Sequence, residues 1–382
     1  MKIVTSLPVD WRKASLVGRI AGAEGPSPVL VRDGRLIDIS AAAPTTADAL
    51  AGADAAALSG VDLGAVEDLE FSTAWSDEPG ITLLSPLDLQ CIKASGVTFA
   101  VSALERVIEE RARGDAEAAN AIRDGLKARI GGDLRDLRPG SPEAEAVKTA
   151  LIADGLWSQY LEVAIGPYAE IFTKAPVLAS VGWGAMVGVR DDSAWNNPEP
   201  EVVVVCDPDG RPVGATLGND VNLRDIEGRS ALLLGKAKDN TASAALGPFI
   251  RLFDDHFTMD DVRSARVRLS VEGEDGFRLD GESSMALISR DPEDLIAQTL
   301  SSHQYPDGFA LYLGTMFAPV EDRDAPGKGF THKIGDTVRV SSERLGVLEN
   351  VVTTCTHAPP WTMGVGGLMR NLAARGLLGV PV

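Results

Sequence analysis

The sequence predicts an α+β protein, with a small N-terminal α+β domain followed by a larger domain built on a mixed β-sandwich or β-roll. From about residue 176 onward, short β-rich runs recur with turn residues between them, which is typical of such sheets. Residues 101–161 instead show helical patterns, and Pro79-Gly80 separates them from the N-terminal part. We therefore expect one domain over residues 1–80 and a second over 84–382, with 101–161 as a helical insertion.

The N-terminal domain is expected to hold a hairpin and a helix. Two apolar runs, Val29–Val31 and Arg35–Ile39, flank the turn dipeptide Asp33-Gly34, which is a hairpin signature. The alanine-rich residues 46–59 predict a helix. In the helical insertion, residues 102–113 show a helical period, and Ser141-Pro142 marks the start of a further helix.

The larger domain is expected to be mostly strand. The apolar runs with turn signals between them predict strands over residues 177–181, 186–189, 202–206, 267–271, 310–313, 338–341 and 347–352. Helices are expected near 239–255, over 292–302 and from about 364 to the C-terminus.

Charge and hydropathy exclude several classes of partner. The net charge of −19 disfavours binding to nucleic acid and to anionic membrane surfaces. No stretch approaches the roughly 18 to 20 apolar residues of a membrane span. The N-terminus has no apolar core of a signal peptide, and the three cysteines are far apart, so we expect free thiols in the reducing cytoplasm.

Three carboxylates in the sequence predict a divalent-metal site. Glu199 and Glu201 stand two apart at the start of the apolar run 202–205, so their side chains point to the same side of a strand mouth. Such a pair repels itself unless a cation lies between the two groups. With Asp220 they offer hard oxygen ligands, which suit Mg or Mn better than Zn. The alternative is a solvated acidic turn before a strand.

The motifs around these carboxylates resemble the fumarylacetoacetate hydrolase superfamily. The Glu-x-Glu pair is followed by Gly218-Asn219-Asp220 with Arg224-Asp225, and then by Lys238 ahead of Leu246-Gly247-Pro248. The resemblance covers roughly residues 84–382. It implies the fold of that superfamily, a metal held by the three carboxylates, and at least a dimer, which we expect to be a homodimer or a dimer of dimers.

Further stretches are similar to one branch, the 2-keto-3-deoxy-pentonate dehydratases. They contain Ser95 and Thr98, His303 and Gln304, Gly314 and Thr315, and residues 358–364. The resemblance implies a small 2-keto-3-deoxy sugar acid of D-xylonate or L-arabinonate metabolism as the partner. It also implies Mg as cofactor, with Mn as a substitute, and 2-oxoglutarate semialdehyde and water as products.

The position of a catalytic dyad separates this chain from the hydrolases of the superfamily. Those enzymes carry His-x-x-Glu, whereas Ser102 and Glu105 stand there in this sequence. A serine is a poor general base, which argues against carbon–carbon bond cleavage. Glu105 is the expected acid at the carbon 4 hydroxyl, with Ser102 beside it. The same Ser-x-x-Glu pattern also fits a helix capping box.

The remaining site residues are expected to bind the substrate or to act on it. Lys238 suits a base or an enolate stabiliser, and the alternative is a structural salt bridge to Asp220 or Glu201. Gly314 and Thr315 are expected to bind the substrate carboxylate through a backbone N–H and a hydroxyl. The expected substrate contacts also include Ser95, Thr98, His303 and Gln304.

Three functions remain open from the sequence. The first is the dehydratase. The second is an acylpyruvate hydrolase or 2-oxo acid decarboxylase with the same metal ligands. The third is a protein that binds a metal and a 2-keto acid without turnover.

Overall fold

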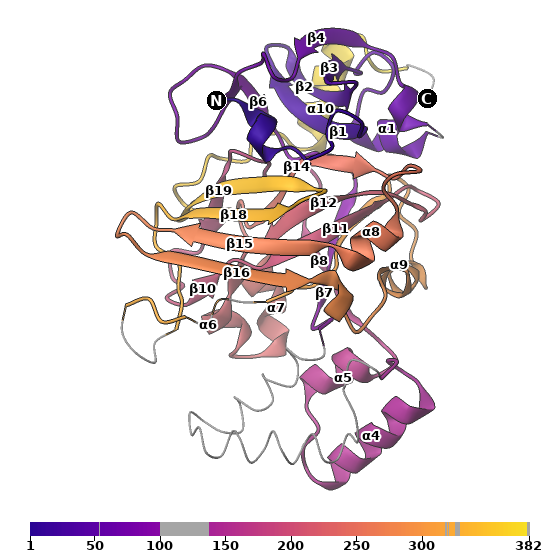
Figure 1. The fold of residues 1–382 in the computed structure, drawn as a ribbon, viewed down its shortest axis with the longest axis vertical. Coiled ribbons are helices and arrows are strands. Elements are labelled where there is room, and N and C mark those ends of the chain that lie inside the picture. The colour runs from indigo at the N-terminus through magenta and orange to yellow at the C-terminus, as the bar shows by residue number, and fades with distance from the viewer. Residues whose placement is uncertain (53, 100–136, 318, 320, 325–328, 380–382) are drawn as a thin grey trace.

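The computed structural model describes residues 1–379 except 53, 100–136, 318, 320 and 325–328. Within this part the chain forms two large sheets that pack face to face, a two-stranded ribbon and short helices, and the helices of residues 142–165 lie below the sheets (Figure 1). The mixture of sheets and helices confirms the predicted α+β class. No helix in the described ranges is long and apolar enough to cross a membrane.

The larger sheet has twelve strands in the order β4-β3-β2-β1-β14-β12-β11-β17-β7-β8, with β6 attached to β1 and β5 to β6. Its strands are β1 (Leu16–Gly22), β2 (Gly25–Arg32), β3 (Arg35–Asp38), β4 (Val61–Ala65), β5 (Phe71–Ser72), β6 (Ile81–Leu83), β7 (Cys91–Gly96), β8 (Glu170–Ala175), β11 (Pro200–Cys206), β12 (Pro212–Asp220), β14 (Ala244–Leu252) and β17 (Phe309–Tyr312).

The second sheet has five strands in the order β16-β15-β18-β19-β9. They are β9 (Met186–Val189), β15 (Arg266–Glu272), β16 (Arg278–Ser284), β18 (Thr337–Ser342) and β19 (Gly346–Thr354), and a separate ribbon pairs β10 (Asn196–Asn197) with β13 (Asn222–Leu223). The α-helices are α1 (Thr46–Ala51), α4 (Pro142–Ala153), α5 (Gln159–Ile165), α6 (Arg224–Glu227), α7 (Leu234–Lys238), α8 (Met259–Ser264), α9 (Pro292–Leu300) and α10 (Val365–Ala374).

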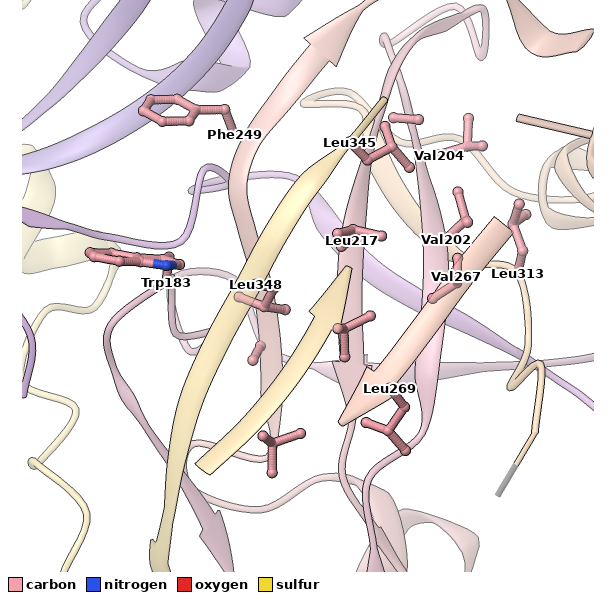
Figure 2. Packing of buried hydrophobic residues seen from close by; sticks show 14 of the residues in the cluster. Trp183, Val202, Val204, Leu217, Phe249, Val267, Leu269, Leu313, Leu345 and Leu348 are labelled. Carbon is pink, nitrogen blue, oxygen red and sulfur yellow. The ribbon is translucent and has the colours of Figure 1, made fainter. Parts of the chain in front are cut away.

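The core lies between the two sheets. Alternate residues of β11 point to opposite faces, and all four valines of its run are fully buried, because both faces of the strand are covered. Figure 2 shows Val202 and Leu217 of the larger sheet with Val267 and Leu348 of the smaller sheet in the space between them. This packing fixes the strands whose ends carry the acidic residues.

The local signals of the N-terminal part are confirmed. The hairpin joins β2 to β3, with Asp33 and Gly34 at φ 51° and 75°, which are the dihedrals of the turn favoured in two-residue hairpins. The helix predicted over residues 46–59 is shorter, since α1 ends at Ala51 before Gly52. Residues 102–113 lie outside the described ranges, while Ser141 caps α4 with Pro142 at its first position.

Two sequence predictions in the larger domain are wrong. Residues 239–255 contain β14 rather than a helix, because this alanine-rich segment is buried between β1 and β12 and pairs with both. Residues 177–181 form no strand, and only Val181 makes a bridge, to Ala245. The other predicted strands and the helices at 292–302 and after 364 are present, with ends shifted by a few residues.

The N-terminal strands continue the main sheet, because β1 pairs with both β2 and β14. The C-terminal helix α10 also lies beside this region, where Arg375, which follows it, donates a hydrogen bond to the carbonyl of Pro26 at 2.8 Å (Figure 1). The domain boundary near residue 80 stays a prediction.

Candidate metal centre

The three predicted carboxylates meet where β11 begins and β12 ends. The two strands are antiparallel, and Pro200 pairs with Asn219, so Glu199 and Asp220 stand next to each other. The Asp220 amide donates to the Glu199 carbonyl at 3.0 Å. One carboxylate oxygen from each of Glu199, Glu201 and Asp220 lies within 4.8 Å of the others, and the three residues are 1–3% exposed. The sequence therefore predicted a grouping that the fold produces.

Lys238 reaches this cluster from the end of α7. Its ammonium donates to Asp220 Oδ2 at 2.9 Å and to Glu199 Oε2, so it pairs with Glu199 rather than with Glu201. Burial acts to lower the pKa of Lys238, but the Asp220, Glu199 and Glu227 carboxylates outweigh it and raise the pKa above its usual value. The charged form of Lys238 is therefore favoured.

A second lysine, which sequence reasoning missed, lies behind Asp220. Lys174 of β8 is 0% exposed, and its ammonium lies 2.6 Å from Asp220 Oδ1. It also donates to the carbonyls of Val221, at 3.1 Å, and Lys238. A lysine inside the short β-prone segment 170–175 was the available signal, because a buried lysine needs a charged partner.

The two lysines of the cluster form ion pairs with Asp220 and Glu199 rather than with Glu201. Burial raises the pKa of Glu201 well above its usual value, and the Asp220 and Glu199 charges raise it further. Glu201 Oε2 accepts a hydrogen bond from the Gly314 amide at 2.7 Å, and no ion pair to Glu201 occurs among the described residues. For Asp220, burial would raise the pKa, but Lys174 and Lys238 lower it below its usual value.

An amide links the cluster to a fourth carboxylate. Asn222 Nδ2 donates to Glu199 Oε1 at 3.0 Å and to Glu227 Oε2 at 2.7 Å. Asn219 Oδ1 in turn accepts from the Glu199 amide at 3.1 Å. These partners fix the Glu199 carboxylate in orientation, as the outer hydrogen bonds of metal ligands commonly do. Glu227 was not among the predicted site residues.

The predicted residues Ser95, Thr98 and Gly314 lie together beside Glu201. Gly314 has φ +101°, and a Cβ there would lie 2.0 Å from Thr98 Oγ1, so only glycine fits. Thr98 Oγ1 donates to the Leu313 carbonyl at 2.6 Å. The Gly314 amide, which we expected at the substrate carboxylate, is directed to Glu201 in this structure, and Thr315 Oγ1 donates to the Phe317 carbonyl at 3.0 Å.

Other predicted residues do not join the cluster. His303 and Gln304 precede β17, and β17 runs antiparallel to β11, with Phe309 opposite Cys206. They therefore lie toward the opposite end of these strands from Glu201. The His303 ring stacks on Tyr305 with centroids 4.6 Å apart. Ser102 and Glu105 lie outside the described residues.

The donor set fits a hard divalent cation. All three side chains are carboxylates, and neither a cysteine nor a histidine belongs to this group in the described part of the chain. Four carboxylates, with Glu227 included, face two lysines, so an ion of charge +2 would bring the cluster to neutrality. Among the described residues the Glu201 carboxylate has a hydrogen bond from a backbone amide and no ion pair, so it is the ligand that such an ion would compensate most.

A family model matches the part of the chain that carries this site. Residues 178–353 match the fumarylacetoacetate hydrolase C-terminal family. This segment contains the ends of β11 and β12 that carry the three carboxylates, and it contains Lys238. The match falls on the part of the chain whose motifs resemble that superfamily.

Two curated relatives match the chain over about half its length. The 2-dehydro-3-deoxy-D-arabinonate dehydratase of Saccharolobus solfataricus is 32% identical over 182 residues, which are 47% of this chain and 57% of the relative. A probable 2-keto-3-deoxyxylonate dehydratase of Haloferax volcanii is 30% identical over 195 residues, 51% of this chain and 64% of the relative. The match therefore spans less than two thirds of either relative.

A solved structure shares the fold over most of the chain. It is a 2-keto-3-deoxy-D-arabinonate dehydratase complexed with magnesium and 2,5-dioxopentanoate. The TM-score is 0.61 at 20% identity, over 89% of this chain and 99% of that one. The likeness confirms the expected fold.

Proposed function

We propose that this chain is a magnesium-dependent hydro-lyase that removes water from a 2-keto-3-deoxy-pentonate and forms 2-oxoglutarate semialdehyde. The observation that carries the proposal is the buried group of Glu199, Glu201 and Asp220 with Lys238 against it. The two curated relatives, both named as dehydratases, support the same reaction class. The product bound in the structural neighbour, 2,5-dioxopentanoate, is the same compound as 2-oxoglutarate semialdehyde.

The substrate has a carboxylate at carbon 1, a ketone at carbon 2, a methylene at carbon 3 and hydroxyls at carbons 4 and 5. Magnesium held by Glu199, Glu201 and Asp220 would polarise the carbon 2 ketone and so acidify the carbon 3 protons. Loss of a carbon 3 proton and of the carbon 4 hydroxyl makes one water. The remaining enone tautomerises so that carbon 5 becomes the aldehyde.

The residues of this chain have separate tasks in that scheme. Lys238 lies against two of the carboxylates, where its ammonium form would stabilise the negative charge that develops on the carbon 2 oxygen, whereas removal of the carbon 3 proton would need its neutral form. Lys174 and Asn222 hold Asp220 and Glu199 in place. Glu105, with Ser102 beside it, remains our proposed acid at the carbon 4 hydroxyl.

The test is product analysis with and without metal. Chelator-treated protein should lose turnover of 2-keto-3-deoxy-D-xylonate and of its L-arabinonate equivalent, and Mg or Mn should restore it. The aldehyde is detected by coupling to an aldehyde dehydrogenase. Pyruvate as the product would show carbon–carbon cleavage instead, and loss of the enol absorbance of acetylpyruvate would identify the hydrolase.

A protein that binds the metal and a 2-keto acid without any turnover would be the non-catalytic alternative. Restoration by Zn alone would show that the ligand set is misassigned. We also propose that the protein acts in the cytoplasm as a homodimer or a dimer of dimers, which light scattering of the purified chain would measure.

A further inference from the structure

Glu227 is a fourth carboxylate beside the cluster, and the Asn222 amide connects it to Glu199. It ends helix α6, and its side chain is half-buried, whereas Glu199, Glu201 and Asp220 are at most 3% exposed. Asn222 Nδ2 donates to both Glu227 Oε2 and Glu199 Oε1, at 2.7 and 3.0 Å. The two accepting oxygens are therefore within about 6 Å of each other, since they share one donor at ordinary hydrogen-bond distance.

The other charged side chains of α6 have different neighbours. Asp225 accepts from Ser193 Oγ and from the Ala194 amide, each at 2.8 Å. The Arg224 guanidinium lies 5.4 Å from the Trp195 ring centroid. Glu227 is the residue of this helix that Asn222 connects to Glu199, a carboxylate of the cluster.

The charge of Glu227 acts on the cluster over this distance. Burial is the main cause that raises the pKa of Glu199, and the Asp220 and Glu227 charges raise it further, against Lys238. Glu227 also contributes to the raised pKa of Lys238, after Asp220 and Glu199. A second negative group brought to the same place by a ligand would meet the same field.

A five-carbon 2-keto acid bound at the carboxylate cluster would be long enough to extend to Glu227. Its carbon 2 and carbon 5 are roughly 4 Å apart in an extended chain of ordinary bond lengths. With the keto group at the cluster, the tail can lie beside Glu227. An ionised carboxylate only accepts hydrogen bonds, so it favours a hydroxyl there and repels a second carboxylate.

We propose that Glu227 determines substrate specificity: it accepts a hydrogen bond from a tail hydroxyl and disfavours 2-keto acids that carry a second carboxylate. The proposal rests on the proposed function, because the tail position follows from a keto group bound at Glu199, Glu201 and Asp220. It gives a role to Glu227, which has none in the proposed reaction scheme.

The experiment compares two unreactive ligands of equal length. Both 5-hydroxy-2-oxopentanoate and 2-oxoglutarate have five carbons and no carbon 4 hydroxyl, so neither can lose water at that carbon. They differ at carbon 5, which carries a hydroxyl in one and belongs to a carboxylate in the other. Their dissociation constants are measured by calorimetric titration of the magnesium-loaded full chain, for the wild type and for Glu227→Gln.

The wild type should bind the hydroxy acid more tightly than 2-oxoglutarate. In Glu227→Gln the ratio of the two constants should shift toward 2-oxoglutarate by about tenfold, the usual scale for one charge–charge contact near a surface. Glutamine keeps an acceptor for Asn222, so the fold should be retained. Glu227→Asp keeps the charge and should keep the wild-type preference.

Asp225→Asn is the matched control, because it removes the same charge from the same helix without touching the Asn222 bridge. Its ligand preference should equal that of the wild type. An unchanged preference in a folded Glu227→Gln, or an equal shift in Asp225→Asn, would overturn the role of Glu227 alone. If the wild type bound no 2-keto acid with magnesium present, the proposed function itself would fail as well.

Discussion

Buried carboxylates are neutralised in two different ways in this molecule. Asp336 lies opposite Arg323, whose two terminal nitrogens contact its two oxygens at 2.6 and 2.7 Å, and both side chains are 1% exposed. The Lys333 amide adds a bond at 2.8 Å. Burial alone would raise the pKa of Asp336, but Arg323 and His332 lower it below its usual value. This pair is saturated by the planar fork of the arginine.

The carboxylate cluster at the start of β11 is not saturated in this way. Lys174 forms an ion pair with Asp220, and Lys238 forms ion pairs with Asp220 and Glu199. Glu201 instead accepts a hydrogen bond from a backbone amide, and its pKa is raised. This difference distinguishes Asp336, a buried carboxylate that stabilises the fold, from Glu201, a buried carboxylate that we propose binds a cation. In a structural ion pair the two charges neutralise each other, while a binding site retains unbalanced charge that a cation can compensate.

Replacing Glu201 by Gln should have the largest effect. It removes one of the three proposed metal ligands, so metal-dependent turnover should be abolished, and magnesium should no longer raise the melting temperature. The melting temperature without metal should not fall, because the neutral amide removes a buried charge that lacks an ion pair among the described residues. The coupled aldehyde assay and thermal unfolding measure both effects. Full activity of a metal-stripped variant would contradict the assignment.

The opposite pattern is expected at Asp336. Asp336→Ala leaves the buried Arg323 guanidinium without its main partner and should lower the free energy of unfolding by about 3–5 kcal/mol. The shift that magnesium produces should remain. Because the folded pKa of Asp336 lies below its unfolded value near 3.8, this stabilisation is present above that pH and is lost as the pH falls through the folded pKa.

Asp275 provides the control for Asp336, since it also contacts Arg323, at 3.1 Å, but its side chain is 37% exposed. Asp275→Ala should cost at most about 1 kcal/mol. Chemical denaturation of the three proteins measures the difference. Equal losses for the two variants would show that the buried pair is no stronger than its exposed neighbour.

A hundredfold effect on turnover is expected at Lys238. Lys238→Met should slow turnover by at least about a hundredfold, the usual scale for the loss of a general base or a preorganised charge. Lys236 lies on the same helix with an exposed side chain, so Lys236→Met is the control and should be silent. Near-normal turnover of Lys238→Met would show that this lysine is a structural partner of Asp220, as Arg323 is of Asp336.

The smallest effect is expected at Thr98, which braces the segment that contacts Glu201. Thr98→Val removes the hydrogen bond to Leu313 and frees the Gly314 amide from its position, so magnesium affinity should fall by about tenfold. Thr98→Ser keeps the hydroxyl and should bind magnesium as the wild type does. Calorimetric titration with magnesium checks both, and an unchanged affinity in the valine variant would leave Thr98 as packing alone.

The sequence was informative where local rules decide structure. Asp33-Gly34 specifies a two-residue turn, Ser141-Pro142 starts a helix, and the valines after Glu201 specify a buried strand. It failed at β14, where alanines that suit a helix in isolation are used in a central strand. There the neighbours on both sides, β1 and β12, overrode the intrinsic preference.

For the site, the sequence by itself determined the grouping of Glu199, Glu201 and Asp220, the proposed metal ligands, because the two-residue alternation of a strand and the motif spacing bring them together. Only the tertiary structure decided the second layer. It brought in Lys174 from β8 and Glu227 through Asn222, and it placed His303 and Gln304 away from Glu201. The physical reason is that strand direction and inter-strand pairing join residues far apart in the chain, and no local pattern records which ends meet.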